Sequence, residues 1–276
     1  MDDETLITTL YCLVDDWYKS RGQSLVASRP GPKPTCTDAE VLTIELARQI
    51  MAGLPERRFL RWLRHNHPDR FLHLPDDGNF NRRLRSLRFL LADFFTWLVQ
   101  GVDTTFTNLD TTPVPVVKLA RATRRKTFRD DQELAAGRGY DVVSKSFYYG
   151  YKLVLLNTLE GIPARAGLVP ADVDDREAAA WLLVRAAPGW YLADKGLRSR
   201  ALREALAREG KKLLAIPRRN EKEQWPEPLR ELVGRYRRRI ETAISILKRC
   251  YRLTEHGVRT FSGLVTRVLA KVIALL

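Results

Sequence analysis

The order of predicted strands and helices between residues 105 and 249 restricts the fold of this chain more than any other feature. β-rich runs are expected at 105–110, 147–158, 162–171, 189–194 and 212–217, and helices at 176–185, 197–209 and from about 228 onward. Strands joined by a short turn pair antiparallel, whereas strands joined through a helix pair parallel. This order predicts an α/β fold whose mixed sheet is flanked by helices.

The first 100 residues predict an all-helical region. Apolar residues recur with the helical period from Leu6 to Trp17, and the segment 28–34, with four Pro or Gly residues, breaks this helix. Thr37 and Glu40 have the spacing of a capping box, which starts a helix that ends near Gly53. A single helix is expected over 79–99. We therefore divide the chain into a helical domain, 1–100, and an α/β domain, 101–276.

The charge of the chain indicates a polyanionic partner. The net charge is +14 and the pI is about 10.0, so phosphate-bearing partners are concentrated at the surface and their binding weakens with salt. Residues 57–88 contain nine arginines and three aspartates, and residues 235–252 contain seven basic residues and one glutamate. Nucleic acid is the partner that this pattern favours.

Other patterns narrow the location and the metal chemistry. The acidic, amphipathic start is not typical of a signal peptide, and no apolar run reaches the roughly 18 residues of a membrane span. We expect a cytoplasmic protein without membrane contact, associated with the nucleoid when it binds DNA. The three cysteines lack C-x-x-C spacing, and His65, His67 and His73 lack the spacing of a zinc finger, so a zinc site is not indicated.

Asp110 and Asp194 each follow a predicted strand, in "FTNLD" and "WYLAD". Ligands and catalytic groups gather at the carboxyl ends of strands in α/β sheets, although aspartate is also a common turn residue. If the two strands are neighbours, their carboxylates lie close together. A divalent cation would then be the natural counterion.

Glu241 is the one acidic residue in the basic stretch "RYRRRIETAISILKR". An apolar stripe along this helix is expected to pack on the sheet, with Arg237, Glu241 and Lys248 on one flank at its rim. A third metal ligand beside Asp110 and Asp194 is one interpretation of Glu241. An ion pair with Arg237, four residues before it, is the other.

Four phrases in this order resemble the DDE transposases of bacterial insertion sequences, which share the ribonuclease H-like fold with retroviral integrases. They are "NLDTTPVPV", "YYGYKLVLLNTLEGIPARAGLVPADVDD", "YLADKGLRS" and "RRRIETAISILKRCYRL". Arg237, Glu241 and Lys248 also match the Arg-x3-Glu-x6-Lys part of a signature of related enzymes, in which Gly234 replaces a tyrosine. The resemblance implies a ribonuclease H-like catalytic domain after the helical domain.

The resemblance implies that Asp110, Asp194 and Glu241 are catalytic and hold two Mg²⁺ ions, with Mn²⁺ as a substitute. The expected reactions are hydrolysis at the element ends, which frees a 3′-OH, and attack of that 3′-OH on target DNA. The partners would be double-stranded terminal inverted repeats and target DNA, held by a homodimer, with residues 1–100 as the end-binding and dimerisation region. The residues expected to contact DNA are Arg237, Lys248, Lys195, Arg198, Arg121, Arg124, Arg125, Arg82 and Arg83.

Two other functions remain open from the sequence. A nuclease of the same fold would hydrolyse DNA without joining strands, and a decayed relic would bind DNA without cutting it. The basic loop that carries Arg121, Arg124 and Arg125 could equally be a solvated loop without contact to DNA.

Overall fold

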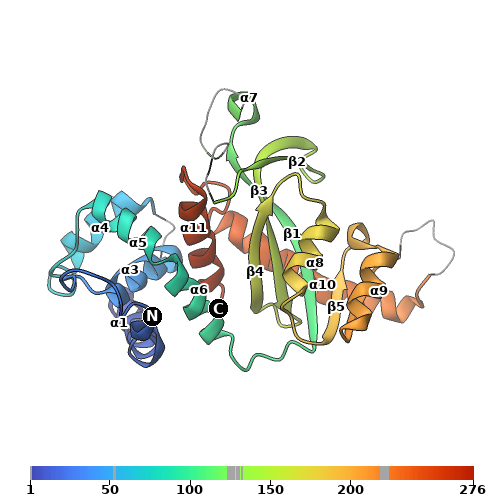
Figure 1. Ribbon diagram of the computed structural model, residues 1–276, viewed down its shortest axis with the longest axis horizontal. Helices are drawn as coiled ribbons and strands as arrows, with labels where there is room; N and C mark the ends of the chain where they lie inside the picture. Colours follow the sequence, from blue (N-terminus) through green and yellow to red (C-terminus); the bar gives the residue numbers. More distant parts are fainter. Residues whose placement is uncertain (1, 52–53, 123–127, 129–130, 132, 218–223) are drawn as a thin grey trace. The chain divides into compact units, whose positions relative to one another are not determined.

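The computed structural model describes the chain except for residues 1, 52–53, 123–127, 129–130, 132 and 218–223 (Figure 1). It separates into two compact units. The first contains Met1–Gln100 together with Ser262–Ala274, and the second contains Gly101–Phe261 and Leu275–Leu276. Residues 262–274, which were expected in the second domain, make their contacts within the first unit.

The described residues of the first unit form only helices, as predicted. They are α1 (Asp3–Trp17), the π-helix η1 (Tyr18–Gly22), α2 (Gln23–Leu25), α3 (Asp38–Met51), α4 (Glu56–Asn66), α5 (Asp77–Ser86), α6 (Arg88–Leu98) and α11 (Phe261–Ile273).

The capping box at the start of α3 is confirmed, because Glu40 N–H donates to Thr37 Oγ1 over 3.1 Å and the Glu40 carboxylate accepts from Thr37 N–H. The single helix expected over 79–99 is wrong. It is two helices, α5 and α6, that meet at Leu87, whose fully buried side chain lies at the break.

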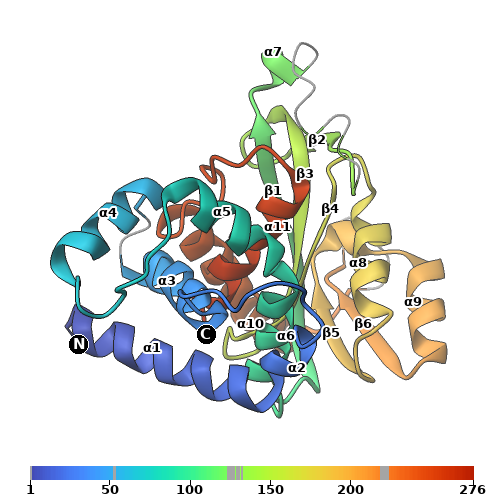
Figure 2. The same cartoon turned by 60° about the vertical axis from the view of Figure 1, so that its left-hand side comes forward.

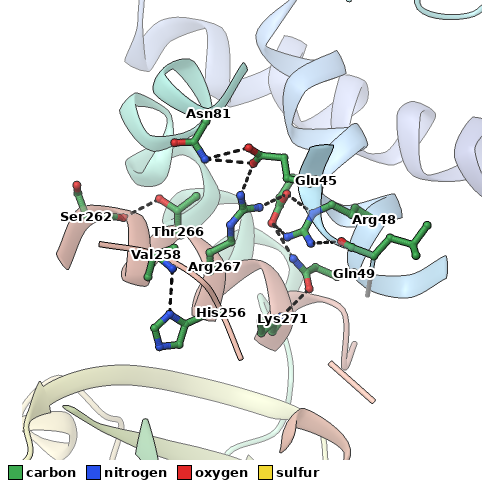
Figure 3. Close-up of polar contacts among 12 residues, drawn as sticks. Glu45, Arg48, Gln49, Asn81, His256, Val258, Ser262, Thr266, Arg267 and Lys271 are labelled. Atoms are coloured by element: carbon green, nitrogen blue, oxygen red, sulfur yellow. Dashed lines mark hydrogen bonds and ion pairs between the residues drawn. The ribbon is translucent and has the colours of Figure 1, made fainter. Parts of the chain in front are cut away.

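A buried network of charged and amide side chains ties α11 to the other helices of this unit (Figure 3). The Glu45 carboxylate, on α3, accepts from Arg48 at 2.7 Å and 2.9 Å and from Arg267, on α11, at 2.7 Å. Arg267 also pairs with Glu56. Lys271 donates to Gln49 over 2.9 Å. These partners explain why α11 belongs to the first unit.

The second unit is the predicted α/β fold, with a mixed sheet flanked by helices (Figure 1). Its elements are β1 (Phe106–Val117), α7 (Leu119–Ala122), β2 (Gly137–Asp141), β3 (Ser146–Thr158), β4 (Pro163–Pro170), α8 (Asp175–Leu183), β5 (Gly189–Ala193), the 3-10 helix η2 (Lys195–Leu197), α9 (Arg200–Arg208), β6 (Lys211–Ala215) and α10 (Glu227–Arg249).

The strands follow the order β2-β3-β1-β5-β6, with β4 also paired to β3. The pairs β1–β3, β2–β3 and β3–β4 are antiparallel, whereas β1–β5 and β5–β6 are parallel. This is the order of antiparallel and parallel pairs that the short and helical connections predict.

Helices cover both faces of this sheet (Figure 2). Leu109 of β1 packs in one core with residues of α8 and α9. The preceding residue, Asn108, points to the opposite face, where its side-chain amide donates to the Tyr236 carbonyl of α10 over 3.1 Å. Because successive side chains of a strand alternate between faces, Asp110 shares the α10 face with Asn108.

Two features of the sheet differ from the prediction. β1 was expected to end at Asp110 but continues to Val117, because Thr111 to Val117 remain paired with β3. The short strand β2 was missed, since "GRGYD" has two glycines and no apolar alternation. Among the described residues, no helix has the length and apolar character needed to span a membrane.

Candidate active site

Asp110 and Asp194 lie side by side on two neighbouring parallel strands. Leu109 of β1 is in register with Ala193 of β5, and Asp110 and Asp194 are the next residues along the chain, Asp110 within β1 and Asp194 directly after β5. Pairing between the two strands ends there, and adjacent strands lie about 4.8 Å apart. The sequence prediction that two neighbouring strands bring these residues together is therefore confirmed by the register, although Asp110 lies within its strand.

Helix α10 brings Glu241 to the same place. Val233, Ile240, Ala243 and Leu247 are buried, which fixes the helix on the sheet, while Leu229 and Leu232 at its start are 40% and 45% exposed. The predicted apolar stripe is thus correct for all but its first turns. Glu241 follows Ile240 and is exposed at the edge of this contact.

The three carboxylates line one open pocket of about 720 Å³. Lys248, two turns after Glu241 on α10, lines the same pocket. The other walls come from the hairpin of β2 and β3, from Lys152 on β3 and from Asp175 at the start of α8. Arg249 also lines the pocket. Cationic side chains such as Lys248 and Arg249 beside the three carboxylates suit a phosphodiester, whose negative charge they can stabilise.

Arg237 occupies the centre of this arrangement. Its guanidinium lies 2.8 Å from an Asp194 oxygen and 3.9 Å from an Asp110 oxygen, and its side chain is 9% exposed. The sequence analysis placed Arg237 at the solvent rim, among the residues that contact DNA or as the ion-pair partner of Glu241. Its side chain instead turns inward to the two aspartates, because it lies on the buried side of α10 together with Val233 and Ile240.

The two aspartates have opposite electrostatic environments. Burial, helped by the neighbouring Asp194 and Glu241 carboxylates, raises the pKa of Asp110 to about 6, although the Thr111 N–H and Arg237 oppose this change. Burial would also raise the pKa of Asp194, but Arg237 outweighs it and the pKa of Asp194 is lowered. Asp110 is therefore the carboxylate whose negative charge is poorly compensated.

The described residues contain no group of three His, Cys, Asp or Glu side chains already gathered at the spacing of a metal site. The guanidinium of Arg237 lies between the two aspartates, where it supplies one positive charge to them. Carboxylate oxygens are the ligands that Mg²⁺ and Mn²⁺ prefer.

The other residues expected to contact DNA are spread over several elements. Lys195 is exposed on η2, directly after Asp194, and Arg198 lines a smaller neighbouring pocket with Arg200, Arg203 and Trp225. Arg121 is exposed on α7, whereas Arg124 and Arg125 lie outside the described residues.

In the first unit, the two arginines expected to contact DNA differ in exposure. Arg82 is exposed on α5 and donates to Asn79. Arg83 is half-buried, and its guanidinium pairs with Asp38 over 2.7 Å.

Two residues that shape this site, Asn108 and Lys152, were not expected from the sequence. Asn108 anchors α10 on β1, and its position two residues before Asp110 was a usable signal because both residues share a face. Lys152 is the single charge within the apolar strand β3, and its ammonium donates to Asp175 over 2.8 Å and to the Val173 carbonyl over 2.7 Å. A lone charge in a strand of this kind was a second signal.

A family model described as a transposase DDE domain matches residues 100–260, which is more than half of the chain. The chain belongs to the DDE transposases. It is therefore a DNA-acting enzyme of a family that depends on divalent cations, as the sequence resemblance implied. No curated protein sequence matches the transposase.

A cryo-EM structure described as a piggyBac transposase synaptic complex with hairpin DNA is similar to the transposase. The match covers 99% of this chain and 74% of that chain, with 11% sequence identity and a TM-score of 0.47.

Proposed function

We propose that Asp110, Asp194 and Glu241 are the catalytic carboxylates with which the transposase hydrolyses DNA at the ends of an insertion sequence and joins the freed 3′-OH to target DNA. The observation that carries this proposal is the register of β1 and β5. It sets Asp110 beside Asp194 at the end of their pairing, with Glu241 of α10 in the same pocket.

The residues present fit divalent cations. The Asp110 carboxylate is half-buried, and burial raises its pKa to about 6. A cation bound to its oxygens would stabilise the charged form of this carboxylate. The place between Asp110 and Asp194 already attracts a cationic group, the Arg237 guanidinium. Two Mg²⁺ ions, or Mn²⁺ in their place, would supply an activated water and stabilise the leaving 3′ oxygen.

The side chains of the pocket then divide into ligands and phosphate contacts. Asp110, positioned by the Thr111 N–H at 2.8 Å, would hold the cations together with Asp194 and Glu241. Lys248 lies on the flank of α10 that also carries Glu241, so its ammonium can receive a non-bridging phosphate oxygen. Arg237 holds Asp194 in place and would move off Asp110 when metal binds.

The test compares Glu241→Gln with Glu231→Gln, because both residues are exposed on α10 and only Glu241 lines the pocket. We expect Glu241→Gln to lose Mg²⁺-dependent cleavage by a factor of about 10³ and to keep DNA binding in Ca²⁺. Glu231→Gln should cut like the wild type. Cleavage by Glu241→Gln at the wild-type rate would remove Glu241 from the site.

We also propose that the first unit binds the terminal inverted repeats and that two copies hold two ends. Arg58, Arg61 and Arg82 are exposed on α4 and α5 of that unit. A fragment ending at residue 100 would lack Arg267, the partner of Glu45 and Glu56, so the full chain is the form to test. Bound to DNA, the protein would be found in the cytoplasm at the nucleoid.

The end-binding role is tested by the salt dependence of binding. Arg61→Ala should lower the slope of log affinity against log salt by about one, uniformly across DNA sequences. Sedimentation with one terminal repeat should give a complex of two chains. An unchanged slope together with a single-chain complex would contradict both parts of the proposal.

A further inference from the structure

The hairpin of β2 and β3 exposes large apolar side chains at the rim of the catalytic pocket. Val142 and Val143 at its tip are 76% and 90% exposed, and Phe147 and Tyr140 are 66% and 49% exposed. Tyr140, Val142 and Val143 also line the pocket of the three carboxylates. Exposed apolar groups gathered in this way mark an interaction site.

The tip is held by its own hydrogen bonds. The Asp141 carboxylate accepts from the Val143 N–H over 3.0 Å and from the Ser144 hydroxyl over 2.8 Å. Tyr140 and Phe147 are paired across the two strands, and their rings lie 5.0 Å apart in an edge arrangement. The apolar side chains are therefore presented by a defined turn.

The base of the hairpin is packed without spare room. A Cβ on Gly150 would lie 2.3 Å from the Val114 carbonyl oxygen of β1, and a Cβ on Gly139 would lie 2.9 Å from the Ala171 carbonyl oxygen. Because the backbone of the hairpin lies this close to Val114 and Ala171, its base has little freedom to bend. The base of the hairpin is also paired with β1, the strand that carries Asp110, from Tyr149 onward.

The charged residues beside the tip and the pocket that it lines favour DNA as its partner. Arg138 on β2 and Lys145 in the turn are exposed beside the apolar residues, and the chain as a whole carries a charge of +14. The tip also shares its pocket with the carboxylates that act on DNA. Proteins that bend DNA combine such cations on the phosphates with an apolar wedge inserted between two base pairs.

We propose that the tip of the β2–β3 hairpin is a wedge that enters duplex DNA and unstacks the base step next to the phosphate in the active site. Val142 and Val143 enter the step, Phe147 and Tyr140 offer ring faces to the bases, and Arg138 and Lys145 contact the flanking phosphates. Unstacking exposes the scissile phosphate to the carboxylates. This inference rests on the proposed location of catalysis at Asp110, Asp194 and Glu241.

The test places 2-aminopurine at successive positions around the cleavage site and measures its fluorescence on binding in Ca²⁺, which prevents cutting. Wild type should raise the fluorescence at one step, and the double variant Val142→Ser/Val143→Ser should not, while its affinity changes little. Val184→Ser is the matched control, because Val184 is 66% exposed in the same unit and lies outside the pocket. Val143→Leu should keep the signal.

Cleavage in Mg²⁺ provides the second readout. The double variant should cut paired DNA at least about tenfold more slowly, and a mismatch at the sensitive step should restore its rate, because the substrate is then already unstacked. A wild-type fluorescence signal from the double variant, or a mismatch without effect, overturns the wedge. Conversion of a dimer to a monomer by the double variant without DNA also overturns it, since the tip would then contact a second copy.

Failure of the wedge and failure of the proposed site give different results. The fluorescence signal of the wild type in Ca²⁺ does not require cutting. If Glu241→Gln cuts at the wild-type rate and this signal is still present, the proposed site is wrong and the wedge is not contradicted. Loss of the signal in wild type, with Glu241→Gln inactive, contradicts the wedge alone.

Discussion

Each unit of the transposase contains a carboxylate that is shielded from solvent, Glu45 completely and Asp110 only in part, with 24% of the Asp110 side chain exposed. The charged groups around the two carboxylates differ. Glu45 in the helical unit is fully buried and receives both Arg48 and Arg267. Asp110, in the α/β unit, accepts a hydrogen bond from the Thr111 N–H, lies 3.9 Å from the Arg237 guanidinium and has the carboxylates of Asp194 and Glu241 near it. Burial opposes both charges, but the two arginines of Glu45 overcome it and lower the pKa, whereas the pKa of Asp110 is raised to about 6.

This difference indicates that Glu45 stabilises the fold of its unit, whereas Asp110 is available to bind a cationic ligand. A buried acid whose charge and hydrogen bonds are satisfied by side chains is closed to metal ions. A buried acid with too little positive charge around it costs stability, and it is retained where that charge is supplied by a cofactor or substrate. The comparison can be tested by changing each carboxylate and its environment.

The largest expected effect is that of Glu45→Gln on stability. This change removes the carboxylate that the buried guanidiniums of Arg48 and Arg267 share, although Arg267 keeps its pair with Glu56. Breaking a buried pair in this way costs about 3–5 kcal/mol. Thermal unfolding followed by circular dichroism measures the loss. Glu4→Gln is the control, because the Glu4 side chain is 63% exposed in its pair with Arg70 and should change stability by less than about 1 kcal/mol. Equal effects of the two variants would show that burial of Glu45 is unimportant.

The next effect is stabilisation by metal. Added Ca²⁺ at about one hundred times its dissociation constant should stabilise the wild type by about 2.7 kcal/mol relative to EDTA, because it binds the folded state only. Asp110→Asn should lose this stabilisation, while Glu45→Gln should keep it. Stabilisation of Asp110→Asn by Ca²⁺ as large as that of wild type would place the metal elsewhere.

A smaller effect is a pH dependence of opposite sign in the two units. The pKa of Asp110 is raised from 3.8 to about 6, so without metal its contribution to stability should increase as the pH falls through 6, by about 2 kcal/mol at about pH 4. The pKa of Glu45 is lowered from 4.5, so its contribution should be lost as the pH falls below 4.5.

This pH dependence is measured by unfolding in EDTA from pH 4 to pH 8. The difference between wild type and Asp110→Asn isolates Asp110, and the difference between wild type and Glu45→Gln isolates Glu45. If the stability contributions of Asp110 and Glu45 changed with pH in the same direction, the predicted difference between the two units would be wrong.

The smallest effect is a difference in thiol reactivity. Burial raises the pKa of Cys36, in the helical unit, to about 11, whereas Cys12 and Cys250 are exposed. Iodoacetamide at pH 8 should label Cys12 and Cys250 and leave Cys36 unmodified, because the thiolate is the reactive form. Glu45→Gln should speed labelling of Cys36 by loosening its unit, and Asp110→Asn should not. Mass spectrometry of the labelled peptides gives both rates.

Much of the secondary structure could be predicted from the sequence, because it depends on residues near one another in the chain. The capping box of Thr37 and Glu40 and the apolar periods of α3 and α10 act within a few residues. The same holds for the strand order, since a short connection gives an antiparallel pair and a helical crossover gives a parallel pair. β2 was missed because its pairing with β3, and not its composition, makes it a strand.

The candidate carboxylates were also within reach of the sequence. Asp110 and Asp194 follow apolar strand residues, and Glu241 is the one acid in a basic helix. The charge state of these carboxylates could not be predicted from the sequence, because it depends on which charged groups the fold places near them. The inward turn of Arg237 follows from the rotation of α10 on the sheet, which the Asn108 contact to Tyr236 helps to fix.

The sequence by itself thus determined the α/β order, the helical first region and the acidic residues of the site, since local periodicity and spacing encode them. Only the tertiary structure decided that α11 completes the helical unit, through a pair between Glu45 and Arg267 that are 222 residues apart. It likewise decided that Arg237 lies between two aspartates and that Val142 and Val143 stand exposed at the pocket. Burial and charge pairing over such separations arise only when the chain has folded, because they depend on distances in space.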